Sequence, residues 1–541
     1  MTGRSGDRIG SACSERTSWW AIFIVLGALT TVWSLSTPID LGTDEQEHTV
    51  KAVAVARGQL QTATVDELGP YGISIPQTRA EVPEAYDALQ EVAGCWRAPV
   101  GSLRDRPPGE TDQAADALER CVPPVSDGET VVMTTFVGTY PPTYYALVGW
   151  PSLVLAPTTA FYAMRAVSGL LSAAFLASAL MSAASLRQAR LVVPAAALGA
   201  TPLVLFLSGS INPNGLEVTA ACAAFTSGIA LLSGRGRVPR RLLVRTVLAI
   251  VTLAGIRSLG PAFAAGTVII ALLIAGDRAT VARLWADRAV RAAAAVVAVC
   301  VALAVGFTAA VGTDVITVPT DPGVSSASLA LGHLESLPTY QVDAVGRLAV
   351  IAAQGTDVPR VMAWAWVIAV VFLAGAAVVV GRWRDRAAVL LLIAATAGLP
   401  VVAQLVSDEA IPWYGRYTLA VSAGLPVVAA LAVSRSAHVR TSVTTAAGAV
   451  LAVGIGAVHL TAIERQLRVV EAVATTLPWS GPVRPMLLLA AGAVAAVLYA
   501  ASLLVLALRS VRPVPAGEDE GTQTGLGAAA GARPIGGAPA V

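Results

Sequence analysis

Apolar stretches long enough to cross a membrane recur along this chain, and they restrict its fold more than any other feature. A helix needs about 20 mainly apolar residues to span the roughly 30 Å hydrocarbon core of a bilayer. By this criterion we expect about twelve such helices, at residues 19–36, 161–186, 191–208, 214–233, 242–257, 259–275, 292–312, 360–380, 387–405, 417–433, 441–460 and 486–508. The predicted fold is an all-α polytopic membrane protein.

Composition supports this class of protein. Of the 541 residues, 55% are hydrophobic and 13% are charged, whereas a soluble globular domain carries about 25% charged residues. This composition argues against a soluble enzyme, a nucleic-acid-binding protein and a disordered scaffold. The lipid bilayer is therefore an expected partner, and no nucleic-acid partner is expected.

Arginine is concentrated in alternate connections and predicts the orientation of the chain. It precedes the first span, within residues 4–16, and occupies the connections 187–190, 235–241, 278–291, 382–386, 435–440 and 509–512. All of these lie on one side if both termini are cytoplasmic, and positively charged connections stay in the cytoplasm. Lys51 is the only lysine, which together with abundant alanine, valine and glycine is typical of a high-GC bacterial genome. We expect a multi-pass protein of the bacterial inner (plasma) membrane.

The connections predict four parts of the chain. They are a cytoplasmic segment (1–18), a transmembrane core (19–435), further transmembrane helices (436–508) and a disordered cytoplasmic tail (509–541). The core includes an extracytoplasmic loop, residues 37–160, whose unusual length indicates a function. Residues 140–157 within it are apolar but short and broken by proline. They predict a helix lying on the outer membrane surface and not a span.

An acidic motif follows the first span. Thr43 and Gln46 form a capping box that predicts a helix starting at Asp44. Asp44, His48 and Lys51 then share one helix face. Acids in a first helical turn can simply complement the helix dipole. Alternatively, a partly desolvated carboxylate at the membrane surface is suited to act as a general base.

Two further motifs combine polar and aromatic residues on the same predicted side. They contain Tyr140, Tyr144 and Tyr145, and Asn212, Asn214 and Glu217. The tyrosines could form an interfacial aromatic belt, and Asn-Pro and Asn-Gly are ordinary turn sequences. A carboxylate such as Glu217 inside a span is costly and usually functional, however. We expect these residues to contact a substrate.

Arginine also occurs at two outer helix ends. Arg416 lies beside Trp413 and Tyr414, and Arg257 lies between two predicted spans. A guanidinium group matches phosphate oxygens well, and aromatic side chains would anchor the site at the interface. Each arginine could instead be a snorkelling side chain near a helix end. Their shared side with Asp44 favours a phosphate-binding site.

Taken together, the motifs resemble those of the GT-C superfamily of membrane glycosyltransferases. They read Asp44-Glu45-x-x-His48, Tyr140-Pro-Pro-x-Tyr-Tyr145, Arg165 near Ser168, Ser210-x-Asn-Pro-Asn-Gly215 and Gly415-Arg-Tyr417. In order and spacing they are similar to a bacterial family of predicted membrane proteins placed within that superfamily. The resemblance covers residues 20–435.

The resemblance implies a GT-C-like fold and a glycosyltransferase whose active site faces the extracytoplasmic side. Such an enzyme takes a sugar from a polyprenyl-phosphate donor and passes it to an envelope glycan, lipid or protein. By position, Asp44 or Glu45 would be the catalytic base of an inverting transfer. Arg416, together with Arg257, would then stabilise the phosphate leaving group, and His48 would contact the donor phosphate or position the acid. A divalent cation, Mg²⁺ or Mn²⁺, is compatible with this scheme, although the sequence contains no complete ligand set.

A transporter or flippase for lipid-linked sugars is the alternative function. Transporters commonly contain internal repeats and place ionisable residues near the bilayer midplane. This sequence contains no repeat between its halves, and the candidate residues gather toward one surface. These two features favour the enzyme.

Cysteine positions predict one disulfide. Cys95 and Cys121 lie in the large outer loop, whereas Cys222 and Cys300 lie in spans and Cys13 lies in the cytoplasmic segment. The extracytoplasmic side is oxidising enough to pair the first two. Closing a loop of about 25 residues would contribute about 3 kcal/mol in the chain-entropy model.

Overall fold

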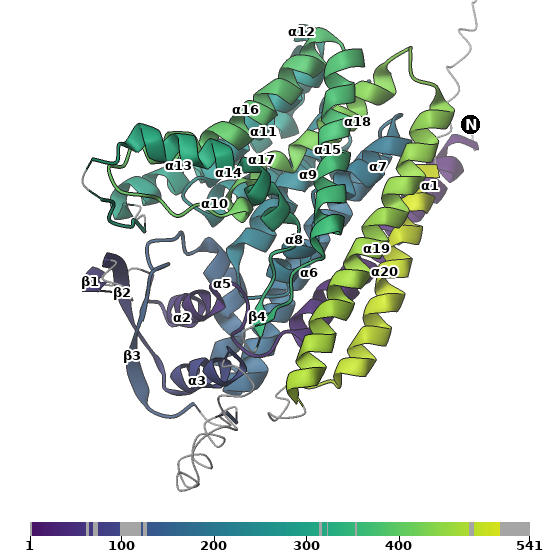
Figure 1. Cartoon of the computed structure of the whole chain (residues 1–541). Coiled ribbons are helices and arrows are strands. Elements are labelled where there is room, and N and C mark those ends of the chain that lie inside the picture. The colour runs from purple at the N-terminus through teal and green to yellow at the C-terminus, as the bar shows by residue number, and fades with distance from the viewer. Residues whose placement is uncertain are drawn as a thin grey trace, which may run out of the picture. The chain divides into compact units, whose positions relative to one another are not determined.

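The structure is a computed structural model that describes residues 3–60, 64–68, 74–97, 121–122, 127–312, 316–321, 323–351, 354–474 and 481–508. The chain divides into two units, residues 1–510 and 511–541. The predicted disordered tail, residues 509–541, lies outside the described residues. Helices make up most of the first unit, to which the following description applies (Figure 1).

Nine helical segments in the described part of the chain are long and apolar enough to cross a membrane. They are α1 (Gly3–Ser36, of which Glu15–Ser36 is the candidate span), α6 (Pro157–Ala184), α9 (Pro213–Ser233), α13 (Arg288–Val311), α15 (Arg360–Val380), α16 (Trp383–Leu405), the segment Gly415–Arg435, α19 (Thr441–Ala474) and α20 (Pro485–Leu508). The segment Gly415–Arg435 consists of η3 (Gly415–Thr418), α17 (Leu419–Ser422) and α18 (Gly424–Arg435). The polytopic helical class is confirmed.

The predicted number of about twelve spans is not confirmed. Two bent helix pairs would raise the nine spans in the described residues to eleven. One pair is α7 (Ala189–Ala197) with α8 (Pro202–Ser208), bent by 60°, and the other is α11 (Gly260–Ala275) with α12 (Arg278–Ala286), bent by 119°. The predicted span 191–208 is broken because Thr201 caps α8, which starts at Pro202. The predicted span 242–257 corresponds to α10 (Arg240–Ile256), whose 17 residues fall short of the hydrocarbon thickness at about 1.5 Å per residue.

Three of the arginine-rich segments that the structure describes, residues 4–16, 235–241 and 278–291, lie near one end of the helical bundle. Glu15 in α1 forms ion pairs with Arg241 (3.3 Å) and Arg245 (3.2 Å) of α10. Arg283 in α12 donates to two backbone carbonyl oxygens just beyond α9. In Figure 1, α12 lies at the end of the bundle opposite the strands. This arrangement agrees with the sidedness predicted from arginine, while the cytoplasmic location of that end rests on the positive-inside rule.

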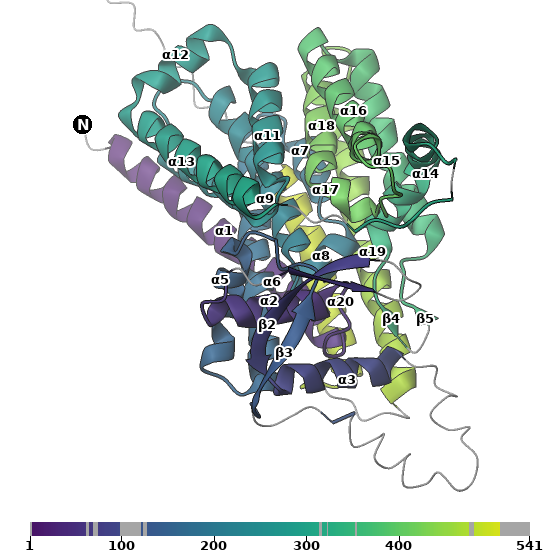
Figure 2. The same ribbon diagram turned by 90° about the vertical axis from the view of Figure 1, so that its left-hand side faces the viewer.

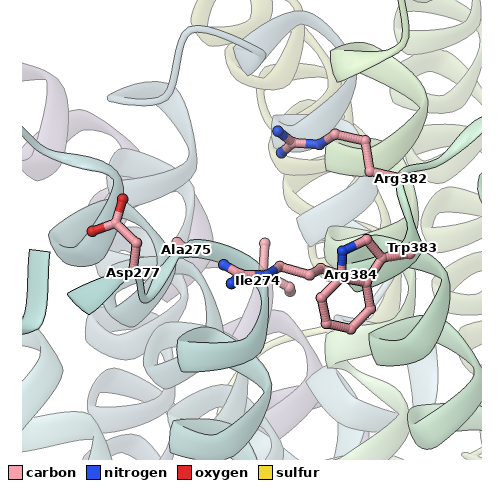
Figure 3. Close-up of a pocket in the computed structure, with 6 residues that line it drawn as sticks. All are labelled: Ile274, Ala275, Asp277, Arg382, Trp383 and Arg384. Atoms are coloured by element: carbon pink, nitrogen blue, oxygen red, sulfur yellow. The ribbon is translucent and has the colours of Figure 1, made fainter. Parts of the chain in front are cut away.

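A cavity of about 420 Å³ opens at the arginine-rich end (Figure 3). It is lined by Ile274, Ala275, Asp277, Arg382, Trp383 and Arg384. The carboxylate of Asp277 caps α12 by accepting from the backbone N–H of Thr280, and Arg382 pairs with Asp385 at 3.3 Å. Residues that the sequence predicts to be functional do not line this cavity.

The large loop between α1 and α6 has secondary structure of its own. Its elements are α2 (Glu45–Ala56), β1 (Thr64–Leu68), β2 (Ser74–Pro83), α3 (Ala85–Arg97), β3 (Thr130–Thr135), α5 (Thr143–Gly149) and η2 (Trp150–Leu153). The strands form an antiparallel sheet in the order β1-β2-β3, with Thr78 opposite Thr135. No pattern in the sequence predicted this sheet. As predicted for residues 140–157, α5 and η2 are too short to span.

The loop packs around a small apolar core that it shares with the helical bundle, including Phe161 of α6 and Leu216 of α9. Val53 of α2, Val82 of β2 and Leu89 of α3 are fully buried in one cluster. Figure 2 shows β2 and β3 beside α2 and α3. α2 also packs closely on α5. Gly149 allows this contact, because a Cβ at that position would collide with the carbonyl oxygen of Ala52. This packing holds the start of α2 against the helical bundle.

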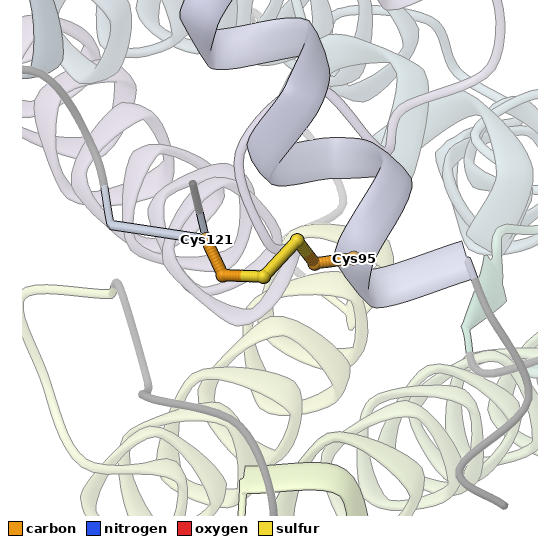
Figure 4. The surroundings of a disulfide bond; sticks show 2 residues. All are labelled: Cys95 and Cys121. Atoms are coloured by element: carbon orange, nitrogen blue, oxygen red, sulfur yellow. A yellow bond between two sulfur atoms is a disulfide. The ribbon is translucent and has the colours of Figure 1, made fainter. Parts of the chain in front are cut away.

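The structure contains the predicted disulfide. Cys95, near the end of α3, is bonded to Cys121, and their Cα atoms are 5.9 Å apart (Figure 4). The segments between Cys95 and β3 that contain Pro99, Pro107, Pro108, Pro123 and Pro124 lie outside the described residues. The bridge therefore ties the far end of α3 to the segment that leads into β3.

Two outer connections contain more helix than the sequence predicts. Segment 313–359 holds α14 (Ser326–Gly346) and a short hairpin of β4 (Val350–Ile351) and β5 (Gln354–Gly355). α19 continues to Ala474, well beyond the predicted end at residue 460. α14 packs closely on η3. Gly415 allows this contact, because a Cβ at that position would collide with the carbonyl oxygen of Tyr340. That close contact sets the position of the next residue, Arg416.

Candidate functional site

The acidic motif adopts a strained turn at the start of α2. The helix begins at Glu45, one residue later than predicted, and Asp44 takes a left-handed conformation with φ 55°. The predicted capping box of Thr43 and Gln46 is wrong, because the N-cap residue is Asp44 and not Thr43. The Glu45 carboxylate instead accepts the backbone N–H of Gly42 at 2.9 Å. Asp44 makes no side-chain capping bond. Left-handed non-glycine residues are uncommon and tend to occur at functional sites.

Glu45 is buried and its carboxylate is fully occupied. It receives two hydrogen bonds from Arg165, at 2.8 and 2.6 Å, in a pair whose side chains are both inaccessible to solvent. The backbone N–H of Ile211 donates to it at 2.8 Å, in addition to that of Gly42. Four donors saturate the two carboxylate oxygens. This argues against Glu45 as the base and favours Asp44.

Arg165 links three segments of the chain beneath the site. Besides Glu45, it donates to the carbonyl oxygens of Ser34, Thr37 and Pro38 at the end of α1. From the sequence, Arg165 was recognised only as part of the resemblance to the GT-C superfamily. A lone arginine inside an apolar span is costly and marks a functional or structural centre, and this signal could have identified it.

Asp44 forms an ion pair with Arg416. Asp44 Oδ2 and Arg416 Nη2 are 2.6 Å apart, and the side chains are 32% and 10% exposed, respectively. The Arg416 guanidinium lies over the rings of Tyr414 (4.5 Å) and Tyr417 (5.0 Å). Arg416 Nε is buried without a hydrogen-bond partner. The structure thus brings together the predicted base and the predicted phosphate-binding arginine.

Arg257 organises a second polar group. Its Nη1 donates to Asn214 Oδ1 (2.6 Å) and to Glu217 Oε2 (3.3 Å). Its Nη2 is 3.4 Å from the hydroxyl of Tyr140, and its guanidinium lies over the rings of Tyr140 and Tyr417. Asn214 and Glu217 are three residues apart in the first turn of α9 and therefore share a face.

Asn212 connects the two polar groups. Its side-chain oxygen caps α9 by accepting the backbone N–H of Asn214 at 2.9 Å. Its Nδ2 donates to the carbonyl oxygen of Thr43 at 2.7 Å, directly before Asp44. Asn212 is thus a positioning residue and not a substrate contact.

His48 faces the site from the first turns of α2. Its Nδ1 lies 2.9 Å from the hydroxyl of Tyr145. Burial, followed by the charges of Arg257 and Arg416, holds the pKa of His48 well below its usual value of 6.5. The ring is therefore neutral at pH 7, so it acts as a hydrogen-bonding group and not as a cation.

Tyr144 and Tyr145 support the site from behind. Both side chains are fully buried, and the hydroxyl of Tyr144 lies 3.0 Å from Ser168 Oγ. Neither residue lines the cavity described next. In this structure both side chains pack behind the cavity, and Tyr145 contacts His48.

A cavity of about 310 Å³ lies between the two polar groups. Seven residues predicted to be functional line it: Asp44, His48, Tyr140, Asn214, Glu217, Arg257 and Trp413. The cavity is also lined by Ser258, Phe263 and Tyr417. Of these, only Tyr417 belongs to one of the sequence motifs. Arg416 borders the cavity through its ion pair with Asp44, and Tyr414 is 39% exposed beside it.

Two other ionisable residues of this region have structural contacts. Lys51 donates to the carbonyl oxygens of Leu60 and Gly138, and burial lowers the pKa of its amine to about 8. Burial and the neighbouring charge of Glu45 raise the pKa of Asp40 to about 8. Asp40 accepts a hydrogen bond from Thr49 at 3.2 Å, behind the turn that carries Asp44.

The residues present do not fit a divalent cation. Within the described residues, no group of three or more His, Cys, Asp or Glu side chains could hold a metal ion. Asp44 is paired with Arg416, and Glu217 is paired with Arg257. Both carboxylates are therefore engaged by arginine and not arranged to hold Mg²⁺ or Mn²⁺.

These features define a polytopic helical membrane protein with a polar cavity framed by connections between its helices. Within that class, the chain belongs to a family described as predicted membrane protein (DUF2142), whose model matches residues 27–425. No curated protein and no solved structure matches the chain. The matched region contains every predicted catalytic and binding residue.

Proposed function

We propose that the protein is a membrane glycosyltransferase. It moves a sugar from a polyprenyl-phosphate-type lipid donor to an envelope glycan, lipid or protein on the extracytoplasmic side. The observation that carries this proposal is the 2.6 Å contact between Asp44 and Arg416 beside the cavity. This contact supports the proposal, because a carboxylate is suited to proton abstraction and a guanidinium is suited to a phosphate leaving group.

The proposed reaction is a single displacement. The acceptor hydroxyl oxygen attacks the anomeric carbon while Asp44 takes the hydroxyl proton. The bond between the anomeric carbon and the phosphate oxygen breaks, and the electron pair leaves with the lipid phosphate. Attack opposite the leaving group inverts the anomeric configuration. General-base help of this kind contributes about 10²–10⁴-fold to the rate.

Arg416 has two successive roles in this scheme. In the ligand-free protein its guanidinium holds the Asp44 carboxylate. The donor phosphate then competes for the guanidinium and releases Asp44 toward the acceptor. Because the guanidinium also lies over Tyr414 and Tyr417, it is preorganised for the charge that develops on the leaving phosphate.

A second cavity is suited to the apolar part of the donor. It has a volume of about 640 Å³ and is bounded by α14, α15, α16 and α18. Its lining is mainly aliphatic and includes Val345, Trp366 and Val370. Leu419, two residues after Tyr417, also lines it. An isoprenoid chain held here would bring its phosphate toward η3.

A flippase or transporter for lipid-linked sugars remains the second candidate. The aliphatic cavity alone would serve either function. The ion pair of Asp44 favours the enzyme, because a flippase needs no proton acceptor beside the headgroup. Reconstitution distinguishes the two, since a flippase moves intact donor between leaflets and a transferase cleaves it.

The test is sugar transfer by purified protein in liposomes supplied with a panel of polyprenyl-phosphate sugars. Wild type should release or transfer one of them, and Asp44→Asn should lose at least about 100-fold in turnover while remaining folded. Asp343→Asn is the matched control, because Asp343 is 31% exposed and also pairs with an arginine, at 3.1 Å. Full activity of Asp44→Asn would exclude this mechanism.

A further inference from the structure

Two side chains that line the 310 Å³ cavity carry polar atoms without partners. Glu217 is 1% exposed, and its Oε2 is held by Arg257 at 3.3 Å while its Oε1 has no hydrogen-bond partner. Trp413 Nε1 is likewise buried without a partner. Buried polar atoms in native proteins are almost always satisfied, so each exception needs an explanation.

The two unpaired atoms have complementary chemistry. Glu217 Oε1 is an acceptor, and Trp413 Nε1 is a donor. A phosphate group would satisfy only the donor, and an ammonium group would satisfy only the acceptor. Hydroxyl groups can satisfy both, because each one both donates and accepts. The cavity is therefore matched to a polyhydroxylated ligand.

Its size and walls also suit a sugar ring. About 310 Å³ is at the lower end of the range for ligand pockets, about 300–1,000 Å³. Trp413 and Tyr417 contact each other edge to face, with ring centroids 5.5 Å apart, and offer apolar surface to the face of a ring. Asp44 lines the same cavity, so a ring held there lies beside the proposed base.

We infer that Glu217 selects the transferred sugar by accepting a hydrogen bond from one of its ring hydroxyls at Oε1, while Trp413 donates to a second hydroxyl. This inference rests on the proposed function and names the residues that set its donor specificity. Arg257 fixes the Glu217 carboxylate by holding the other oxygen. The ligand class is a neutral hexose or pentose attached to the polyprenyl phosphate.

Glu217→Gln inverts the chemistry of this contact without changing its size. Arg257 has only donors to offer, so the amide oxygen stays with Arg257 and the amide NH₂ group takes the position of Oε1. The sugar hydroxyl then meets a donor where it had an acceptor. Trp413→Phe removes the indole N–H and keeps an aromatic wall, so it tests the second hydroxyl separately.

The experiment measures donor binding in nanodiscs by calorimetry. All proteins carry Asp44→Asn, so that bound donor is not consumed. The probes are polyprenyl-phosphate-linked hexoses and analogues that each lack one ring hydroxyl. A site built to hydrogen-bond a hydroxyl rejects the analogue that lacks it by a large factor. We expect the Kd of one analogue to be at least about 100-fold higher than that of the complete donor. In Glu217→Gln this ratio of Kd values should fall below about tenfold.

The control is Glu464→Gln, which removes a carboxylate from the exposed pair with Arg468 on α19. It should retain the full discrimination. If Glu217→Gln in the Asp44→Asn background discriminates as Asp44→Asn alone does, the inference is wrong, even where wild type transfers sugar. If Asp44→Asn binds no linked sugar and wild type transfers none, the proposed function fails as well. Equal binding of all analogues by Asp44→Asn alone would also overturn the role of Glu217.

Discussion

Glu45 and Asp44 are adjacent carboxylates for which the structure predicts opposite responses to the same substitution. Glu45→Gln should destabilise the fold. The Glu45–Arg165 pair is inaccessible to solvent on both sides, and removing one partner of a buried pair costs about 3–5 kcal/mol. The amide NH₂ group would also face N–H donors from Arg165, Gly42 or Ile211. Molecules that remain folded should still transfer sugar.

The measurement combines unfolding with turnover. The free energy of unfolding is obtained from reversible SDS denaturation in mixed micelles, and transfer is assayed below the transition. Arg165→Gln should destabilise by a similar amount, and the double variant by less than the sum, because both single variants lose the same ion pair. Asp44→Asn should show the reverse pattern, with near-normal stability and no transfer. Wild-type stability with lost transfer in Glu45→Gln would identify Glu45 as the base and refute this reasoning.

Three further predictions follow from the site and the loop. Arg416→Lys should weaken donor binding and slow turnover together, because lysine lacks the bidentate fork and the stacking on tyrosine rings; normal donor kinetics in Arg416→Ala would make the arginine a simple interfacial anchor. The pKa of Asp40, raised from 3.8 to about 8, means that the folded state binds more protons than the unfolded state between these values. Stability should therefore fall as the pH rises from about 4 to 8, and Asp40→Asn should flatten this dependence in unfolding experiments. Mass spectrometry of non-reduced peptides should find Cys95 linked to Cys121, whereas free alkylation of both in thiol-blocked membranes would exclude the bridge.

The membrane class of this protein is determined by its sequence alone. Hydrophobicity over about 20 residues is a local property of the chain, and it decides whether a helix is stable in lipid. The arginine content of the connections is likewise a local property, and Glu15 of the first arginine-rich segment contacts Arg241 of another at one end of the bundle. Local patterns were less reliable where a break depends on packing, as in the predicted span 191–208, which divides into α7 and α8. The β-sheet was missed because its strands are stabilised by each other and not by a periodic pattern within one segment.

The candidate residues were also recognisable in the sequence, because ionisable groups are rare in so apolar a chain. Their roles were decided only by tertiary structure. Asp44 and Glu45 are neighbours of the same chemical type, yet one meets Arg416, 372 positions away, and the other meets Arg165, 120 positions away. Burial beside Arg165 saturates Glu45, while Asp44 is turned toward the cavity by its left-handed backbone. Such contacts depend on how distant helices pack, and a local pattern of residues contains no information about which distant arginine a carboxylate will meet.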